Sequence, residues 1–408
     1  MVEVTMNGLE EMRKLIEEGD VDVLRTMVKQ MAEALMGAEV DALCGAAHGE
    51  RHPERTNQRN GYRTRPWDTR SGTIDLALPR LREGSYFPDW LLTPRKRSEQ
   101  ALVAAIADAY LAGVSTRRVD KLVRTLGIEG ISKSEVSRLA ASLDEVVEAY
   151  RSRPLSGAYP FLSLDALHVK VREGGRICSV AAVHAVGVST DGRRESLGLD
   201  LITSEDGAGW TAFLRGLVAR GLSGVVLVTS DAHPGLVDAV AATLPGASWQ
   251  RCRTHFARNL LTRVPKAAQP AVATMVRSIF AQPDAESVRE QHERVVAQLG
   301  ERFASAAELL EEAGEDILAF TAVPKEVWRQ VWSNNPLERL NREIRRRTDV
   351  VGIFPNRSAA LRLVGAVLAE QNDEWADSGR RYMSLEVIAK TLAPPSPEAT
   401  MEVAMIAA

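Results

Sequence analysis

Three acidic residues, each in a different sequence context, point to metal chemistry. Asp165 follows a short, mainly apolar run, Asp231 ends a second such run, and Glu338 opens a helical stretch rich in arginine. A carboxylate at the end of an apolar strand is costly to leave unpaired, and three of them form an oxygen ligand set suited to Mg²⁺ or Mn²⁺. Such a set can hold two metal ions about 3.5–4 Å apart, which clamp the attacking and leaving oxygens of a phosphodiester. The pattern therefore predicts a two-metal site for phosphoryl transfer on nucleic acid.

The third carboxylate has one competitor in the sequence. Glu343 lies five residues after Glu338 and so faces another side of the same helix. Glu338 is favoured because it directly follows an Asn-Asn-Pro helix start. It also places Arg345 two turns further along its own face, where a cation can hold a phosphate.

Basic residues are concentrated in two stretches, although the chain of 408 residues carries a formal net charge of -3. Residues 51–97 contain eleven Lys or Arg against five Asp or Glu, and residues 339–347 contain five Arg against one Glu. A solvated surface is the alternative explanation for either stretch alone. Two such stretches, one of them beside the proposed metal site, favour contacts with DNA phosphates.

The remaining composition is that of an ordinary soluble protein. Hydrophobic residues make up 45% of the chain, and no apolar run approaches the ~20 residues that span a bilayer. The N-terminus has no signal pattern, and the widely spaced Cys44, Cys178 and Cys252 are typical of free thiols in a reducing compartment. We therefore expect a cytoplasmic protein that is nucleoid-associated when on DNA and has no membrane partner.

The N-terminal part of the chain predicts a mainly helical DNA-binding region. Residues 1–45 are expected to be helical, with an apolar stripe that lacks an evident partner and makes them a candidate dimerisation segment. Residues 46–97 mix Gly, Pro, Asn and Arg and predict a basic arm, with one short strand at 73–78 that Pro79 ends. Residues 98–150 predict two helices separated by a glycine, as in a helix-turn-helix DNA-binding domain.

A mixed α/β catalytic domain is predicted after a Pro- and Gly-bearing linker at 151–157. It covers residues 158–253 and resumes at 333–375, and an all-helical insertion at 254–332 separates the two parts. Residues 376–408 are expected to form a C-terminal tail. The expected strands are 159–164, 177–189, 196–201, 225–229 and 248–250, and the expected helices between them are 207–220 and 234–243.

Several blocks of the sequence resemble one family. Residues 231–237, followed by 249–255, are similar to the signature of the mutator-type bacterial insertion-sequence transposases. Residues 335–347 fit the same family, as do the N-terminal elements 59–65 and 78–82.

The resemblance, which covers roughly residues 30–385, implies a ribonuclease-H-like catalytic domain with a helical insertion. It also implies an Asp-Asp-Glu triad using Mg²⁺ or Mn²⁺, which falls on Asp165, Asp231 and Glu338. The leading interpretation is a transposase that binds terminal inverted repeats and target DNA and cuts and joins strands. A structure-specific nuclease of the same fold and a catalytically inactive DNA-binding regulator remain as alternatives. Because two element ends must be processed together, a homodimer is expected.

Other residues are expected to contact DNA. They are Arg59, Arg63 and Arg65 of the basic arm, Lys133 and Arg138 of the helix-turn-helix, His255 and Arg345. Cys252 and His255 have a spacing that can share a metal, but no second Cys/His pair lies nearby to complete a zinc site, and a simple packing pair remains an alternative. Trp328 and Trp332 are most simply core residues, with stacking on an unpaired base as the other interpretation.

Overall fold

The computed structural model describes residues 23–69, 71–92, 100–111, 114, 118–119, 121, 124, 143–204 and 206–393 of the chain. The chain forms two compact units, Met1–Ser142 and Leu143–Ala408. Lys133 and Arg138, together with the whole second helix of the expected helix-turn-helix, lie outside the described residues.

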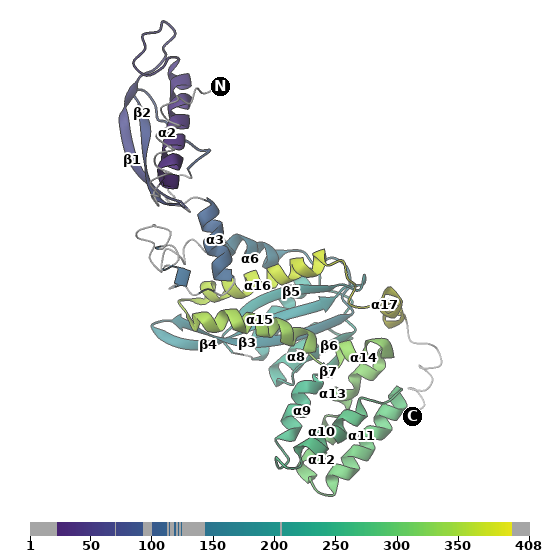
Figure 1. The fold of residues 1–408 in the computed structure, drawn as a ribbon. Coiled ribbons are helices and arrows are strands. Elements are labelled where there is room, and N and C mark those ends of the chain that lie inside the picture. Colours follow the sequence, from purple (N-terminus) through teal and green to yellow (C-terminus); the bar gives the residue numbers. More distant parts are fainter. Residues whose placement is uncertain are drawn as a thin grey trace. The chain divides into compact units, whose positions relative to one another are not determined.

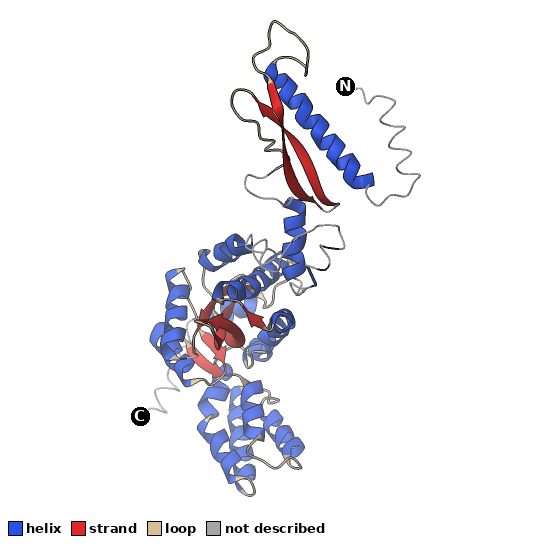
Figure 2. Cartoon of the chain, turned by 90° about the vertical axis from the view of Figure 1, so that its left-hand side faces the viewer, coloured by secondary structure: helices blue, strands red, loops and turns tan. Residues whose placement is uncertain are grey.

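In the first unit, one helix packs against a two-stranded antiparallel sheet (Figures 1 and 2). Apolar side chains recur every four positions of the helix and contact the apolar face of the second strand. Of the apolar positions that predicted a stripe on this helix, Val28 and Val40 pack against the strand, whereas Leu24, Met31 and Leu35 are exposed. The buried residues are Ala32, Met36, Val40 and Cys44 on the helix and Ile74, Leu76 and Leu78 on the strand. The elements are α2 (Val23–Cys44), β1 (Arg59–Thr69), β2 (Gly72–Leu81) and α3 (Gln100–Leu111).

Strand β1 occupies a stretch that the sequence predicted to be an irregular arm. Only its last three residues are buried and most of the others are exposed, so its sequence shows no alternation of polar and apolar residues. Strand β2 also continues through Pro79, which was expected to end it. Pro79 lies opposite Tyr62, beside a register shift between Arg59 and Tyr62, and proline is tolerated at such irregularities in edge strands.

The second unit is built on a six-stranded mixed sheet, in agreement with the predicted α/β class. The first three strands form an antiparallel meander, and the next two run parallel to the first of them. The strand order is β5-β4-β3-β6-β7, and a short β8, which the sequence did not predict, pairs with β3. The strands are β3 (Phe161–Glu173), β4 (Arg176–Val188), β5 (Arg194–Ile202), β6 (Leu227–Ser230), β7 (Ser248–Arg251) and β8 (Ile353–Phe354).

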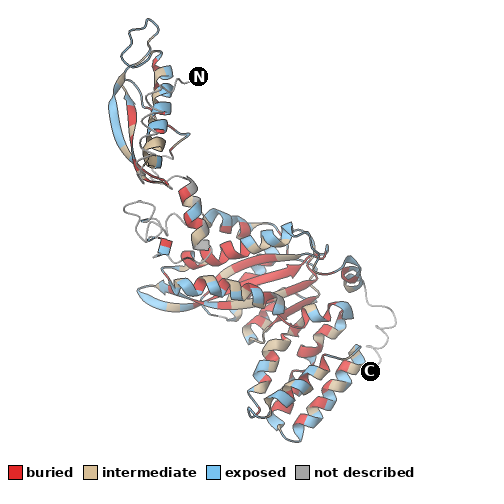
Figure 3. Ribbon diagram, viewed as in Figure 1, coloured by how far each residue is buried: buried red, intermediate tan, exposed pale blue. Residues whose placement is uncertain are grey.

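Helices cover both faces of this sheet (Figures 1 and 3). Because alternate residues of a strand point to opposite faces, Leu162 and Leu164 of β3 face one layer and Asp165 faces the other. Leu162 and Leu164 join the core that contains Trp210 and Leu236 of the first layer. The first layer consists of α7 (Gly207–Ala219) and α8 (Pro234–Thr243), and the second of α6 (Leu143–Ser152), α15 (Asn335–Val351) and α16 (Arg357–Asp377).

Between β7 and α15 the chain forms helices, and their buried side chains belong to a core cluster that also contains Phe161 of β3 and Leu227 of β6. The rings of Phe280, Phe320, Trp328 and Trp332 pack together there, with centroids 5.1–5.7 Å apart. Both tryptophans are buried, so the core interpretation holds and neither ring is free to stack on a base. The helices are α9 (Arg253–Leu261), α10 (Gln269–Ile279), α11 (Ala285–Gly300), α12 (Ala304–Glu312), α13 (Gly314–Leu318) and α14 (Trp328–Val331), and α17 (Leu385–Leu392) follows α16.

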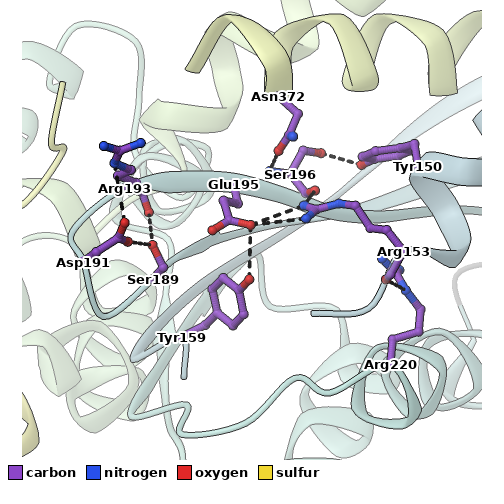
Figure 4. A network of polar contacts seen from close by, with 10 residues as sticks. All are labelled: Tyr150, Arg153, Tyr159, Ser189, Asp191, Arg193, Glu195, Ser196, Arg220 and Asn372. Atoms are coloured by element: carbon purple, nitrogen blue, oxygen red, sulfur yellow. Dashed lines mark hydrogen bonds and ion pairs between the residues drawn. The ribbon is translucent and has the colours of Figure 1, made fainter. Parts of the chain in front are cut away.

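Helix α6 and the segment after it belong to the second unit, which therefore begins earlier than the predicted linker at 151–157. Tyr150 shares a 2.5 Å hydrogen bond with Ser196 of β5. Arg153 donates to the carbonyl of Ser196 and is ion-paired with Glu195, while Arg220 donates to the carbonyl of Arg153 (Figure 4). The polar residues that resembled a flexible linker are thus fixed to the sheet.

No helix among the residues described here is both long and apolar enough to cross a membrane.

Candidate active site

Asp165 and Asp231 lie side by side on neighbouring parallel strands. Ser163 of β3 is paired with Thr229 of β6, and the same register continued by two residues brings Asp165 opposite Asp231. Asp231 directly follows β6, as predicted, at the end of the sheet where open α/β folds bind their ligands. Asp165 lies within its strand instead of at its end, because pairing with β4 continues β3 as far as Glu173.

The start of α15 and the segment before it are held by hydrogen bonds to β3, to β6 and to Cys252, which directly follows β7. The hydroxyl of Thr229 on β6 donates to the carbonyl of Val331 at 2.6 Å. The side-chain nitrogen of Asn334 donates to the carbonyl of Leu164 on β3 at 2.8 Å, and its backbone N–H donates to the sulfur of Cys252, just after β7, at 3.3 Å. Asn334 occupies the cap position, as predicted, but its side chain binds the sheet and not the helix.

Glu338 lies on the face of α15 that is anchored beside Asp165. Asn341 Nδ2 donates to Asp165 Oδ2 at 2.6 Å, and the other oxygen of Asp165 accepts from the N–H of Ala166 at 2.9 Å. Asn334, Glu338 and Asn341 recur at i, i+4 and i+7, so Glu338 lies between the two asparagines that hold α15 to β3. Across the described part of the chain, no three His, Cys, Asp or Glu side chains converge as one ligand set. The structure therefore brings the two aspartates together and leaves Glu338 on the adjacent helix face.

The chemistry of these groups fits a hard divalent cation. Burial, and then the negative charge of Asp165, raise the pKa of Asp231. A bound cation relieves this repulsion between two partly buried carboxylates. The side-chain oxygens of Asn334 and Asn341 are buried beside them without a hydrogen-bond partner. Carboxylate and amide oxygens are the donors that Mg²⁺ and similar ions prefer.

His255 and Cys252 form a pair next to the aspartates. Hydrogen bonding to the Cys252 thiol raises the pKa of His255, and the charges of Asp165 and Asp231 add to this effect. Burial works against ionisation of Cys252, yet contacts with His255 and with the N–H of Asn334 lower its pKa overall. No further Cys or His of the described residues completes a zinc site around the pair.

Glu343, the competing third carboxylate, is engaged elsewhere. It lies 2.7 Å from Arg346 and 3.0 Å from Arg347. The hydrogen bond from Arg346, together with the charge of Arg347, lowers the pKa of Glu343 to about 2. This arrangement supports Glu338 as the better candidate. Arg345 is exposed on α15 and makes no ion pair with any residue that the structure describes.

The three arginines expected to contact DNA from the first unit differ in their surroundings. Arg59 donates to Asp41 at 2.6 Å and joins β1 to α2, so it is committed to the fold and not to an open arm. Arg63 and Arg65 pair with buried residues of β2 and leave the sheet on the face that packs against α2. Arg63 is exposed there, whereas the guanidinium of Arg65 lies 5.1 Å from the centre of the Phe87 ring.

Two polar residues of the site gave little signal in the sequence. Asn341 sits among arginines of an exposed helix, where only its spacing from Glu338 distinguishes it. His184 of β4 pairs with Asp165 and is fully buried, with neither ring nitrogen hydrogen-bonded, and burial lowers its pKa. The signal in the sequence that could have identified His184 is its position within a long apolar run.

The sequence matches a family of known proteins along most of its length. The family described as "Transposase, Mutator family" covers residues 1–378. The chain belongs to the Mutator family of transposases. The transposase for insertion sequence element IS1081 of Mycobacterium tuberculosis is 59% identical over 379 residues, which is 93% of this chain and 91% of that protein.

More distant relatives carry the same description. The transposase for IS256 in transposon Tn4001 of Staphylococcus aureus is 38% identical over 381 residues, covering 92% of this chain and 97% of its own length. The transposase for IS406 of Burkholderia multivorans is 40% identical over 372 residues, covering 90% and 94%. This transposase therefore shares nearly the whole length of its relatives, both units included.

Proposed function

We propose that this transposase serves its own insertion sequence, binding the terminal inverted repeats and cutting and joining DNA strands with metal held by Asp165, Asp231 and Glu338. The observation that carries the proposal is the closeness of the two carboxylates, with Asp165 two residues beyond the last β3–β6 pair, Asp231 directly after β6, and the start of α15 fixed beside them. The strand order β5-β4-β3-β6-β7 supports a ribonuclease-H-like catalytic domain, and the helices between β7 and α15 support a helical insertion within it.

Each proposed ligand residue is positioned by a different part of the fold. Asn341 and the N–H of Ala166 hold the carboxylate of Asp165 in one orientation. Asp231 projects from a strand end, and α15 carries Glu338 to the same edge. Mg²⁺ or Mn²⁺ in a two-metal site would activate the attacking oxygen and stabilise the leaving oxygen. Hydrolytic cleavage and attack by a freed 3′-OH are both displacements at phosphorus, so one site serves both.

His255 is proposed to contact the scissile phosphate or nearby DNA. Its raised pKa keeps more of the imidazole protonated near neutral pH, and it lies beside both aspartates. A positively charged donor at that position stabilises the negative charge that develops on the phosphate. Cys252, buried beneath it, serves as its positioning residue.

Two copies of the chain are proposed to act together on paired element ends. Besides the stripe buried against β2, helix α2 has a second set of apolar side chains on another side. Leu24, Met31 and Leu35 are 59%, 68% and 42% exposed and, at spacings of seven and four residues, share one face. That face offers a surface for a two-fold interface between first units.

The catalytic assignment is tested on duplexes that carry the terminal repeat and its flanking DNA. Asp165→Asn, Asp231→Asn and Glu338→Gln should each lower strand cleavage and strand transfer by roughly 10³-fold or more, because metal binding is lost. His255→Gln should lower the cleavage rate constant about 10²-fold without changing metal affinity. Binding of the repeat DNA, measured by gel shift, should change less than about threefold for all four variants.

Glu343→Gln is the matched control, since it removes a carboxylate from the same helix on a different face. It should keep its cleavage rate constant at saturating DNA. Equal loss in Glu343→Gln and Glu338→Gln would remove Glu338 from the site. Hydrolysis without any joining would identify a nuclease, and binding without cleavage in Mg²⁺ or Mn²⁺ would identify an inactive regulator.

A further inference from the structure

Arginines line a hollow of about 470 Å³ on the flank of α15 that is turned away from the catalytic carboxylates. It lies where the start of β5 meets α15, the C-terminal part of α16 and the segment that follows α16. Four arginines surround it, namely Arg194, Arg339, Arg380 and Arg381, and only one acidic residue, Glu374. The hollow is therefore strongly positive.

Arg194 is held in this hollow by two aromatic rings. Its guanidinium carbon lies 4.6 Å from the centre of the Trp375 ring and 4.4 Å from that of Tyr382. The guanidinium makes no hydrogen bond or ion pair with any described residue, so its N–H donors are not used by the protein. Stacking fixes the plane of the group and leaves its edges for a ligand.

The backbone around Arg194 is built to hold one of these rings in place. The N–H groups of Tyr382 and Met383 donate to the carbonyl of Gly192, in the turn before β5, at 2.7 and 3.1 Å. Gly192 has a φ of 77°, and a Cβ there would lie 2.1 Å from the carbonyl oxygen of Met383. Asp191 and Arg193 on either side are fixed by hydrogen bonds within the turn (Figure 4). Only glycine permits this docking, which sets Tyr382 over Arg194.

The charges in the hollow are unbalanced. Arg339 and Arg380 make no ion pair with the described residues, while the carboxylate of Glu374 accepts a hydrogen bond from Gln371. Burial, and to a lesser degree repulsion from Arg339, lowers the pKa of Arg194. Like charges gathered in a partly buried site are costly unless an anion compensates them. Phosphate oxygens match the planar donor edge of arginine.

The hollow continues into a groove, which favours a DNA backbone over a small anion. Arg339, Gln371 and Glu374 also line an adjoining groove of about 460 Å³, together with Arg342, Arg346 and Arg347. Glu343 and Glu370 line it as well and are ion-paired with Arg346 and Arg347, so Arg339 and Arg342 are the arginines of this lining without an ion pair among the described residues. This groove runs between α15 and α16, which lie next to each other over the same face of the sheet (Figure 1). The arginines thus follow α15 in a line, as successive phosphates of one strand require.

The distance to the active site follows from helix geometry. Arg339 directly follows Glu338 and so lies about 100° around the helix from it. On a helix that is about 10–12 Å across with its side chains, about 100° of rotation separates two surface points by about 8–9 Å. DNA advances about 3.4 Å per base pair, so this separation takes about two to three base-pair steps.

We propose that Arg194, clamped between Trp375 and Tyr382, binds a backbone phosphate of the DNA in the active site together with Arg339 and Arg380. That phosphate lies about two to three base-pair steps from the scissile one. The inference rests on the proposed function, because the DNA is the same molecule that Asp165 and Asp231 act on.

The test uses the full chain and terminal-repeat duplexes at several salt concentrations without divalent metal. Arg194→Lys, Arg339→Ala and Arg380→Ala should each weaken binding roughly tenfold. The two alanine variants should also reduce the slope of log affinity against log salt by about one, whereas Arg194→Lys should leave the slope unchanged. Lysine keeps the charge at position 194 but loses the planar guanidinium, which packs on the two rings and offers several hydrogen-bond donors. Arg215→Ala, an exposed arginine on α7 without an ion pair among the described residues, is the matched control and should bind as the wild type does.

Duplexes trimmed from each side of the cut in turn locate the contact. The difference between wild type and Arg380→Ala should vanish when one side is shorter than about three base pairs and persist when the other side is trimmed. Arg380 does not stack on either ring, so this variant remains informative even if Arg194→Lys lowers the melting temperature.

Two results would overturn the inference while leaving the proposed function intact. One is a wild type that binds and cleaves repeat DNA, with all three variants matching Arg215→Ala in affinity and salt slope. The other is a loss of affinity for inorganic phosphate alone, with DNA binding unchanged. A wild type that neither binds nor cleaves repeat DNA would instead remove the proposed function, and this inference with it.

Discussion

The carboxylate of Asp231 is held under electrostatic strain in the metal-free protein. Burial and the nearby Asp165 raise its pKa, so its protonated form is favoured by folding. Because the pKa of Asp231 is higher in the folded state than in the unfolded state, this carboxyl stabilises the fold at pH values below its unfolded-state pKa. That support is lost as the pH rises through the folded pKa. At neutral pH the charged form therefore reduces the stability of the metal-free fold.

Replacing Asp231 with Asn should raise the free energy of unfolding of the metal-free protein at pH 7, because it removes a carboxylate whose charged form is disfavoured there. The gain should shrink as the pH falls towards about 3.9, the ordinary value for Asp, because wild-type Asp231 then becomes neutral as well. Thermal unfolding in a chelator, followed across pH, measures this. Mn²⁺ should stabilise the wild type and do less for the variant. Asp238→Asn, at an exposed position of α8, is the control, and an equal gain there would contradict the explanation.

Only some of the residues that form the site could be identified from the sequence. Asp165 and Asp231 were recognisable because carboxylates interrupt apolar strands, and both lie together in the structure. Asn341 and Arg194 could not be recognised, because each is distinguished only by a contact with a residue far away in the sequence. Asn341 meets Asp165 across 176 residues, and Arg194 meets Trp375 at the end of α16.

At the level of elements, local patterns located helices well and strand ends poorly. The helix at 234–243 was predicted with the bounds that α8 has. β3 was expected to stop at 164 but continues to Glu173, where buried Leu167, Val169 and Val171 alternate with exposed polar residues, a strand pattern that the prediction overlooked. β1 escaped detection because β2 satisfies its backbone while most of its side chains face water.

Asn334→Ala should change the position of α15 without preventing the helix from forming. The substitution leaves the carbonyl of Leu164 without its 2.8 Å donor, at a cost of about 1–3 kcal/mol. Because this bond fixes the helix that carries Glu338, the cleavage rate constant should fall about 10–100-fold while affinity for repeat DNA is retained.

Asn335→Ala is the matched control for that experiment. Asn335 is exposed and only accepts a 3.2 Å hydrogen bond from Thr254. Cleavage by this neighbouring variant should stay within about threefold of the wild type. Equal loss in both variants would show that the asparagine contact with β3 is not what positions α15.

For the whole molecule, the chain is divided into two compact units. A DNA-binding region before a catalytic domain was expected, with a boundary at 151–157. The second unit instead begins at Leu143, because Asp144 of α6 is held by Arg362 of α16 at 2.7 Å. Such a contact between residues 218 apart leaves no local trace in the sequence.

Assembly can be tested through the exposed apolar face of α2. Met31→Glu combined with Leu35→Glu should shift the transposase towards monomer, because charges replace the side chains proposed to meet in the interface. Light scattering with and without terminal-repeat DNA reports the mass. Gln30→Glu, exposed on a different side of α2, should leave the mass unchanged. A wild type that stays monomeric on paired ends would rule out the two-fold arrangement.

The long stretch of chain between Asp231 and Glu338 also sets an order of events during synthesis. The two residues are separated by 107 positions (338 minus 231), which a ribosome takes about 5–20 s to add at typical rates. Throughout that time the nascent protein already contains the whole first unit and both aspartates but lacks α15. If the first unit binds the element ends as proposed, a polypeptide still being made can hold an end before it is able to cut it. A premature stop anywhere in this interval would then release a product that occupies the ends without mobilising them.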